Sequence, residues 1–327
     1  MITVKKVFAI LLLCVLVLAG NAPAAPVEAG PADDYPNKAI KLVIPYAPGG
    51  ATDIIYRIVA EYAQQELGQP IAVINMGGAS GTIGSRNVKD SAPDGYTVLG
   101  SHDVIATAFY SQVVDYAFDA FEPVCLLTST PNIATTHAKE PWHNMAELLE
   151  DAAKRPGEIV WSVTLGSTDH FFLMGLLNAA GLPIDVLRIA GYDGTGPQIT
   201  ALLGRHTNGC MTNVTSGLSY VKSGDLKFLG VAHPVRMPQI PDVPTLREQG
   251  IPFDHGTNRG VFLPKGTPKE IVDKLAGVFE KVMQHPDVVK KISDLGTIVN
   301  YKSPQEYKTF LDETMKLYGE LSKIADQ

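Results

Sequence analysis

The chain has 327 residues, of which 45% are hydrophobic and 19% are charged, and its formal net charge is −7. That length is sufficient for two domains with buried cores, and the composition is that of a folded α/β protein, not of a disordered or fibrous chain. The acidic balance argues against nucleic acid and anionic membrane as partners. An anionic ligand would therefore have to be held by local hydrogen-bond donors.

The first 29 residues have the layout of a secretory signal peptide. Lys5 and Lys6 precede an apolar run at 7–19, and small residues follow it. The apolar run is too short to span a bilayer, so we expect the leader (1–29) to be cleaved between Ala24 and Ala29. The mature chain is then expected in the periplasm.

Cysteine and histidine residues are few and are not arranged as ligands. Cys125 and Cys210 lie in stretches that look like strands, so we expect buried free thiols. No pair of cysteine or histidine residues has the spacing of a metal site; His137 and His143 are separated by Pro141. The sequence predicts neither a metal nor a cofactor.

Two strand–loop–helix units occupy residues 41–100. An apolar strand at 42–44 enters a turn at 45–50, and Thr52 or Asp53 is placed to cap the following helix. A second strand at 71–74 enters the glycine-rich loop at 77–81, and another helix follows. Both loops thus open helices at the carboxyl ends of strands, where free N–H groups and the helix dipole attract an anion.

The glycines also have a purely structural interpretation, because tight strand-to-helix turns need them. That interpretation is the better one for a single loop, but two loops of the same kind favour an anion site. Gly78, Gly81 and Gly84 are three residues apart, which does not fit the dinucleotide fingerprint, and no Gly-Lys-Ser/Thr sequence follows. Nucleotide binding is therefore not expected.

The rest of the chain continues the alternation of strand and helix, which indicates sheets flanked by helices. In chain order we expect a strand at 96–99 with a loop at 100–103, a crossing strand at 121–130, strands at 159–163 and 186–189 with loops at 164–169 and 191–196, a returning strand at 226–232, and amphipathic helices at 269–285 and 304–325. Loops gathered at one sheet edge are where such folds bind ligands. We expect one lobe from 35–126 plus 233–327 and a second lobe from 127–232.

An exported serine hydrolase is an alternative, because Ser167 and His170 are three residues apart at an expected helix start. No acid is placed to orient the imidazole, however. Ser80 also lacks the second glycine of a nucleophile elbow, because Thr82 stands there. We therefore favour a binding cleft with a structural role for His170, and we do not expect an enzyme.

Several short motifs occur in an order that is typical of one receptor family. They are Pro-x-Ala-Pro-Gly-Gly-x-Thr-Asp at 45–53, Gly-Ala-x-Gly at 78–81, Ala-Pro-Asp-Gly-Tyr-Thr at 92–97, Pro-Asp-Val-Pro-Thr at 241–245 and Pro-x-Gly-Thr-Pro at 264–268. With them the chain resembles the periplasmic solute-binding proteins of tripartite tricarboxylate transporters, the Bug or TctC family. The resemblance spans essentially the whole mature chain.

The resemblance implies an α/β fold of the two-lobed periplasmic-binding-protein kind (Venus flytrap, type II-like). Each lobe would be a mostly parallel sheet flanked by helices, with hinge crossovers between the lobes. Such a receptor, expected as a monomer, closes on a small organic acid and delivers it to membrane permease subunits. A ligand-sensing subunit without transport is a further alternative, and the identity of the acid stays open.

The resemblance also implies which residues contact the ligand. The first-lobe loops would hold a carboxylate through backbone N–H groups and hydroxyls, while the second lobe would select the acid. The matching positions are Ala47, Gly50, Ala51, Thr52, Asp53, Gly78, Ala79, Ser80 and Ser101 in the first lobe, and Thr164, Gly166, Ser167, Tyr192, Asp193 and Asn213 in the second.

Three charged residues need separate expectations. We expect Asp53 to cap its helix and not to meet the ligand's charge. Asp193 stands where family members often carry a basic or neutral residue; a surface position is favoured, but within the cleft it would repel a second carboxylate. Arg259 either pairs with a distal carboxylate or is exposed to solvent.

Overall fold

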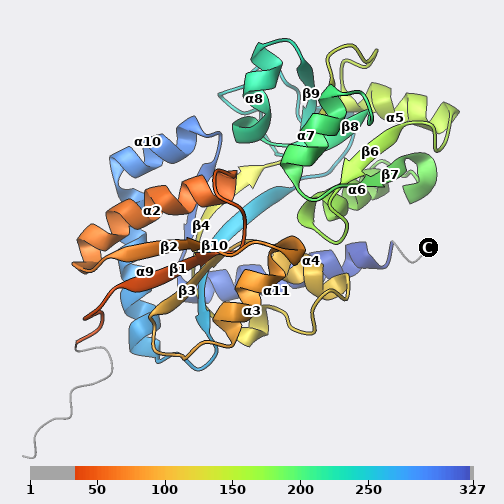
Figure 1. Cartoon of the computed structure of the whole chain (residues 1–327). Helices are drawn as coiled ribbons and strands as arrows, with labels where there is room; N and C mark the ends of the chain where they lie inside the picture. Colours follow the sequence, from red (N-terminus) through yellow and green to blue (C-terminus); the bar gives the residue numbers. More distant parts are fainter. Residues whose placement is uncertain (1–33, 325–327) are drawn as a thin grey trace, which may run out of the picture.

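The computed structural model describes residues 34–324, so the expected leader and its cleavage lie outside the described residues. The chain forms two lobes, each built on one sheet with helices on its faces (Figure 1). The two-lobed α/β architecture expected from the sequence is confirmed. Within residues 34–324, no helix is both long enough and apolar enough to cross a membrane.

The first lobe contains a six-stranded sheet in the order β11-β4-β10-β3-β1-β2. Its strands are β1 (Ile40–Ile44), β2 (Ile71–Asn75), β3 (Thr97–Ser101), β4 (Phe121–Pro131), β10 (Gly256–Pro264) and β11 (Ile298–Lys302). Its helices are α2 (Ala51–Leu67), α3 (Thr82–Lys89), α4 (Val104–Tyr110), α9 (Lys269–Gln284), α10 (Pro286–Asp294) and α11 (Pro304–Ser322), with 3-10 turns η1 (Ala79–Gly81) and η2 (Phe118–Ala120).

The second lobe contains a five-stranded sheet in the order β7-β6-β8-β5-β9. Its strands are β5 (Ile133–His137), β6 (Val160–Val163), β7 (Arg188–Gly191), β8 (Gly209–Thr212) and β9 (Leu226–Val231). Its helices are α5 (Met145–Lys154), α6 (Thr168–Ala179), α7 (Thr195–Leu203) and α8 (Val214–Lys222), with 3-10 turns η3 (Ile184–Val186) and η4 (Arg247–Gln249).

Both sheets are mixed, whereas the sequence was expected to form mostly parallel ones. β1 runs parallel to β2 and β3, but β10 is antiparallel to β3 and β4, and β11 is antiparallel to β4. In the second sheet β6 is parallel to β7 and β8, while β5 is antiparallel to β8 and β9. The antiparallel pairs involve the strands next to the crossings, β4, β5, β9 and β10, together with β11 at the edge of the first sheet. The parallel strands send their following loops to one edge of each sheet.

The two crossings lie side by side at Asn132. Its N–H donates to His255 O at 3.1 Å, and its carbonyl accepts from Ala232 N at 2.9 Å. β4 stays in the first sheet as far as Pro131, and the segment after β9 still packs on the second lobe, where Leu246 joins the core. These contacts bring the segments at Asn132, Ala232 and His255 together between the two sheets.

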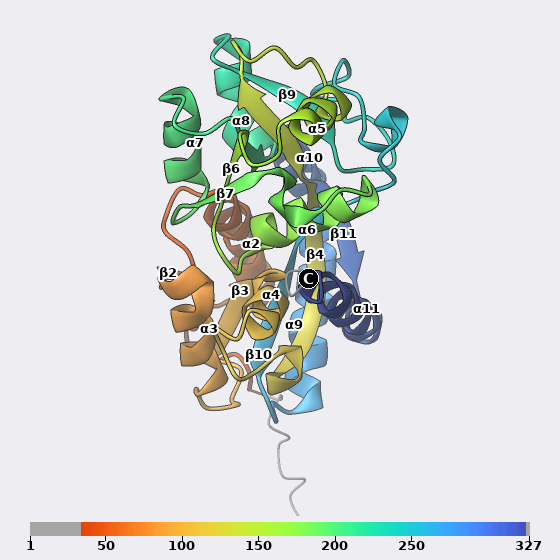
Figure 2. The same ribbon diagram turned by 90° about the vertical axis from the view of Figure 1, so that its right-hand side faces the viewer.

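The C-terminal helix α11 packs on both lobes. Tyr318 lies edge-on against Phe171 of α6 at 5.2 Å between ring centroids, and its hydroxyl lies 3.3 Å from Nε2 of His255. Leu311 of the same helix joins a core cluster formed by first-lobe strands. Figure 2 shows α11 beside α4 and beneath α6, which agrees with these contacts.

Each lobe has its own apolar core. Tyr56, Leu42 and Leu275 belong to the first, and Trp161 and Phe172 to the second. Cys125 and Cys210 are buried free thiols, as expected from their apolar neighbours. With both cores filled by side chains, the loops at the strand ends form the ligand-accessible surface.

Candidate functional site: a cleft between the lobes

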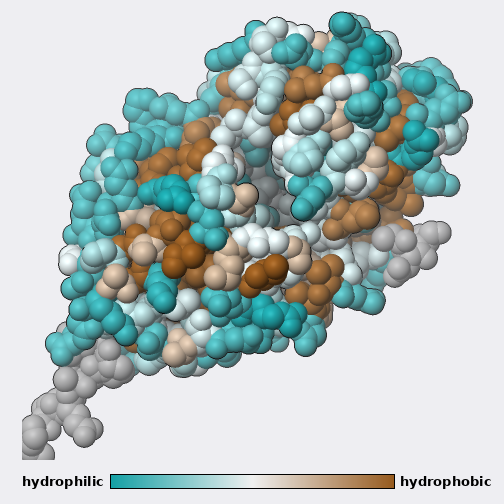
Figure 3. Space-filling model, in the orientation of Figure 1, coloured by the Kyte–Doolittle hydropathy of each residue, from teal (hydrophilic) through white to brown (hydrophobic). Residues whose placement is uncertain are grey.

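A hollow opens between the two lobes where the parallel strands end. In Figure 3 the atoms around this hollow are mostly near-white, the colour of residues of intermediate hydropathy. The loops after β1 and β2 lead into α2 and α3, and the loops after β6 and β7 lead into α6 and α7. The N-cap residue of each of these four helices makes no side-chain capping bond. In α2 the first three N–H groups have no partner in the described chain and are available to a ligand, whereas Thr82 N of α3 donates to Ala79 O and His170 N of α6 donates to Asp169.

The first loop ends at Gly50, which is the extended N-cap of α2. Ala47 and Gly50 are exposed, and Ala51 is half-buried. The expectation that Thr52 or Asp53 caps this helix is wrong, because Gly50 is the N-cap and neither side chain makes a capping hydrogen bond. The helix start is therefore open to the cleft.

Asp53 lies inside the first lobe and stabilises the first loop, residues 45–50, by hydrogen bonds. Its carboxylate accepts from Gly49 N at 2.8 Å, from Arg57 Nε at 2.9 Å and from Asn75 Nδ2 at 2.8 Å. Burial acts to raise the pKa of Asp53, but the hydrogen bonds from Arg57, Gly49 and Asn75 outweigh it and lower the pKa. An Asp53 carboxylate that is already paired does not oppose an anion in the cleft.

The second loop packs directly against the first. Gly78, Ala79, Ser80 and Gly81 have consecutive positive φ angles of 119°, 46°, 54° and 85°. A methyl group on Gly81 would lie 3.2 Å from Pro45 O, so the two backbones approach closely there. Left-handed Ala and Ser cost about 1 kcal/mol or more each, a strain that is common where backbone N–H groups are aimed at a ligand.

The third loop, residues 100–103 after β3, is buried beneath the first two loops. Ser101 is fully buried, and its hydroxyl has no hydrogen-bond partner in the described chain. His102 stacks on Tyr46 at 4.7 Å between ring centroids, and burial lowers the pKa of His102 well below its ordinary value. These rings form a neutral floor under the first loop, and Ser101 belongs to that floor.

Arg259 lies directly behind Thr52. Only 2% of it is exposed, and its Nε donates to Thr52 Oγ1 at 3.0 Å while Nη1 donates to Thr130 Oγ1 at 2.6 Å. The expectation of a solvent-exposed side chain is thus wrong, because the guanidinium is enclosed between β4, β10 and α2. Its buried neighbour Asp103 accepts from Asn258 N at 2.8 Å.

In the second lobe Thr164 joins three segments. Its hydroxyl accepts from Gly194 N at 2.9 Å and from Gln198 Nε2 at 3.0 Å, and its N–H donates to Asp169 at 2.8 Å. Asp169 also accepts from Gln198, and burial raises its pKa. The loops after β6 and β7 are therefore held together by polar side chains.

The other predicted second-lobe residues are distributed around these loops. Tyr192 is half-buried and Asp193 is exposed, as favoured for Asp193. Ser167 is the N-cap of α6 without a capping bond, whereas Asn213 caps α8 by accepting from Ser216 N at 3.0 Å. Gly166 meets the first lobe: a methyl group there would lie 3.1 Å from Ser111 Cβ.

Ser167 and His170 do not form a nucleophile–base pair. Nδ1 of His170 faces Gly166 N at 3.4 Å, and the Asp169 carboxylate is engaged by Thr164 and Gln198. No described carboxylate hydrogen-bonds the His170 ring, and no cluster of metal-ligating side chains occurs within the described chain. The arrangement suits binding and not covalent chemistry.

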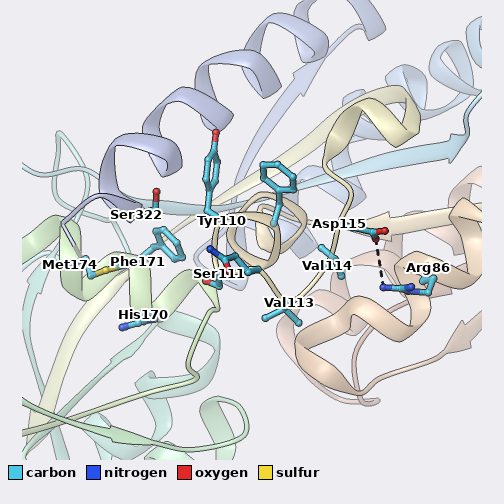
Figure 4. Close-up of a pocket in the computed structure, with 12 residues that line it drawn as sticks. Arg86, Tyr110, Ser111, Val113, Val114, Asp115, His170, Phe171, Met174 and Ser322 are labelled. Carbon is cyan, nitrogen blue, oxygen red and sulfur yellow. Dashed lines mark ion pairs between the residues drawn. The ribbon is translucent and has the colours of Figure 1, made fainter. Parts of the chain in front are cut away.

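A second hollow, of about 930 Å³, lies at the far end of α4 (Figure 4). His170, Phe171, Met174 and Ser111 line it, with none of the predicted site residues. Arg86 and Asp115 form an ion pair at its rim, 4.0 Å apart. The loop cleft is the better anion site, because the two glycine-rich loops that lead into uncapped helices of the first lobe pack together there.

Three contributors to the cleft were not foreseen. Each of the three is buried or half-buried: Asn75 and Gln198 bind residues of the loops or the helix starts after them, and Asp103 ties the loop after β3 to Asn258 of β10. Asn75 and Asp103 could have been noticed as polar residues at a strand end, next to a loop of the site. Gln198 lies inside a helix and carries no such signal.

The sequence matches the tripartite tricarboxylate transporter family receptor profile over residues 55–325. The chain belongs to this family. Protein BugT from Bordetella pertussis is 30% identical to it, over 90% of this chain and 91% of the relative. Members of the family are periplasmic solute receptors and not enzymes, so the hydrolase alternative is set aside.

Solved structures of family receptors agree with the fold. The periplasmic binding protein BugD is 32% identical, with a TM-score of 0.79 over 89% of this chain and 99% of that one. MatC from Rhodopseudomonas palustris, solved with bound malate, is 28% identical with a TM-score of 0.79, over 88% of this chain and 100% of that one. A further Rhodopseudomonas palustris protein, solved with adipate, is 25% identical with a TM-score of 0.79, over 90% and 99% of the two chains.

Proposed function

We propose that this receptor binds a small carboxylic acid in the cleft between its lobes. The observation that carries the proposal is that the loops leading into the uncapped helices α2 and α3 pack against each other, with the Gly81 backbone against Pro45. Their N–H groups and dipoles favour one carboxylate, and no exposed cation has to be desolvated. The malate and adipate in two family members support an acid with a second polar end.

The ligand-contacting set is proposed as the uncapped helix starts and their neighbours. In the first lobe these are Ala47, Gly50, Ala51 and Thr52 with Gly78, Ala79 and Ser80. In the second lobe Ser167, Tyr192 and the Asn213 amide would contact the distal end of the acid and select among acids. Asp53, Ser101 and Thr164 would position the loops, because each is enclosed by protein partners or buried.

We further propose that the chain acts as a periplasmic monomer that delivers its acid to membrane permease subunits. A leader cleaved between Ala24 and Ala29 would export it. N-terminal sequencing of the protein from a periplasmic extract tests the cleavage, and size-exclusion chromatography tests the monomer. Uptake of labelled acid by cells with and without the gene separates delivery from ligand sensing.

The binding proposal is tested by thermal denaturation of the mature chain from Gly30 with small acids and their amides. A ligand at about 100 times its dissociation constant stabilises the folded state by about 2.7 kcal/mol, which visibly raises the melting temperature. Stabilisation by acids and not by matching amides is the expected result. Stabilisation by amides or sugars alone would overturn the anion site.

A further inference from the structure

Arg259 is a buried cation without a carboxylate partner. Among residues 34–324 it is the only lysine or arginine in the buried class, at 2% exposure. Every hydrogen bond it makes ends on a neutral group: Thr52 Oγ1 at 3.0 Å, Thr130 Oγ1 at 2.6 Å and Thr257 O at 3.3 Å. No described carboxylate lies within 4.0 Å of it.

Such a charge is unfavourable unless something compensates it. Removing a guanidinium from water is costly, and buried ions are normally paired with an opposite charge. The nearby acid Asp103 directs its carboxylate to Asn258, at 2.8 Å from the backbone N–H, and acts on Arg259 only through space. The protein alone therefore leaves the positive charge largely uncompensated.

Thr52 connects this charge to the first loop. It is the second residue of α2, and its hydroxyl oxygen is occupied by Arg259 Nε. No hydrogen bond in the described chain uses the hydroxyl proton, so it can be donated to a ligand. An accepted hydrogen bond strengthens the donor on the same oxygen. The field of α2 has the same sign at this point.

We propose that Arg259 is the counter-charge of the bound carboxylate and acts through the Thr52 hydroxyl, so that the site selects an ionised acid over its uncharged amide. This inference rests on the proposed function and adds a specificity-determining residue to it. An anion hydrogen-bonded to Thr52 would lie about 6 Å from the guanidinium. A charge pair at that separation in a partly buried site changes affinity by about 10- to 100-fold.

A purely structural role is the competing explanation, because Arg259 ties β10 to β4 and α2. The two explanations differ in one measurable quantity, the ratio of acid to amide affinity. Loss of a structural tie weakens both ligands together. Loss of a counter-charge weakens the acid alone.

The test uses the mature protein and isothermal titration calorimetry. The probes are the acid that stabilises wild type best, from a panel including malate and adipate, and the uncharged derivative of that acid in which every carboxyl group is an amide. Arg259→Gln is compared with Arg259→Lys, which keeps the charge. Arg188→Gln is the control, since Arg188 is an exposed arginine at the start of β7, at the opposite strand end from the loops.

We expect Arg259→Gln to raise the acid's dissociation constant about 10- to 100-fold and to change that of the amide by less than about threefold. Arg259→Lys should keep most of the acid preference, and Arg188→Gln all of it. An Arg259→Gln protein that binds the acid and still prefers it as wild type does would overturn the inference while leaving the proposed function intact. If wild type binds no acid, the proposed function fails and the inference fails with it.

Circular dichroism and gel filtration show whether each variant is folded. If Arg259→Gln does not fold, Thr52→Val carries the test, because it removes the hydroxyl and preserves the side-chain shape. We expect about a tenfold loss for the acid and little change for the amide. A Thr52→Val protein with wild-type discrimination would overturn the route through Thr52.

Discussion

Asn75 donates its side-chain amide to Asp53 at 2.8 Å, so the last residue of β2 holds the loop that follows β1. The same amide nitrogen lies 3.0 Å from Tyr46 O. Asn75 thus fixes the two sides of the first loop relative to the second strand. The two glycine-rich loops are consequently one rigid unit and not two independent turns.

Asp53→Ala is expected to lower the free energy of unfolding by about 3 kcal/mol. The substitution leaves the donors of Gly49, Arg57 and Asn75 without their acceptor inside the lobe. Urea denaturation of the apo protein measures the change. Asp90→Ala is the control, because its ion pair with Lys89 is on the surface and should contribute less than about 1 kcal/mol. A loss at Asp53 as small as that at Asp90 would show that the loop does not depend on it.

Gly84→Ala is expected to separate the two loops. A methyl group there would lie 2.7 Å from Met76 O and 2.9 Å from Pro45 Cβ, and backbone cannot move aside cheaply. We expect a loss of about 1–3 kcal/mol in stability together with weaker acid binding. Gly277→Ala in α9 is the matched change, because nothing lies within 4 Å and helix propensity favours alanine by up to about 1 kcal/mol. Equal melting temperatures for the two variants would contradict the close packing.

Asp103→Asn is expected to change how stability depends on pH. Burial raises the pKa of Asp103 to about 7, although Asn258 and Arg259 act to lower it. The folded state therefore holds the proton more tightly than the unfolded state, and Asp103 loses its stabilising contribution as pH rises from about 4 to 7. Relative to wild type, Asp103→Asn should gain about 2–3 kcal/mol between pH 5 and pH 8.

Melting temperatures of both proteins across that pH range measure the effect. The side-chain amide oxygen that Asp103→Asn introduces would still accept from Asn258 N, so the variant should fold at pH 5 much as wild type does. His102 stays neutral over the range, because burial lowers its pKa well below the ordinary value. A constant difference between the two proteins from pH 5 to pH 8 would contradict a raised pKa.

Thr164→Val is expected to loosen the loop after β7 without unfolding the second lobe. Its hydroxyl is the acceptor for Gly194 N and for Gln198 Nε2. Faster amide hydrogen exchange at 192–196 and acid binding weakened by about tenfold should result. Thr200→Val on the exposed side of α7 loses only a bond to Gly196 O at 3.1 Å and is the control. Unchanged exchange at Gly194 in Thr164→Val would argue against this connection.

The loops were predictable from sequence because their chemistry is local. Proline and glycine at 45–50 and 77–81 interrupt apolar runs, and such interruptions predict strand-to-helix turns regardless of the rest of the chain. Strand direction is different: the pattern of β10 does not reveal that it pairs antiparallel with β3. The alternation of apolar and polar residues is the same in a parallel and in an antiparallel strand, so the mixed sheets could not be predicted from the sequence.

The interior of the site was less predictable for the same reason. From the sequence alone, Arg259 would be placed on the surface as a charged residue of a strand. Its burial is explained only by its hydrogen bonds to Thr52 and Thr130, which lie far from it in the sequence. The capping error at Thr52 and Asp53 arose because both residue types are good caps, whereas Gly50 holds that position and neither side chain makes a capping bond. Contacts between segments far apart in the sequence explain the burial of Arg259, and no local sequence pattern predicts such contacts.

The position of α11 between the lobes matters for anyone who labels this receptor. The described chain begins at the tip of the first lobe, whereas it ends beside α6 of the second (Figure 1). An environment-sensitive fluorophore near Ser322 would lie close to the contact between Tyr318 and Phe171, where the two lobes meet. A change in its emission on addition of an acid would show whether binding moves the lobes relative to each other, so the C-terminal helix is the place to build a biosensor for the proposed ligand.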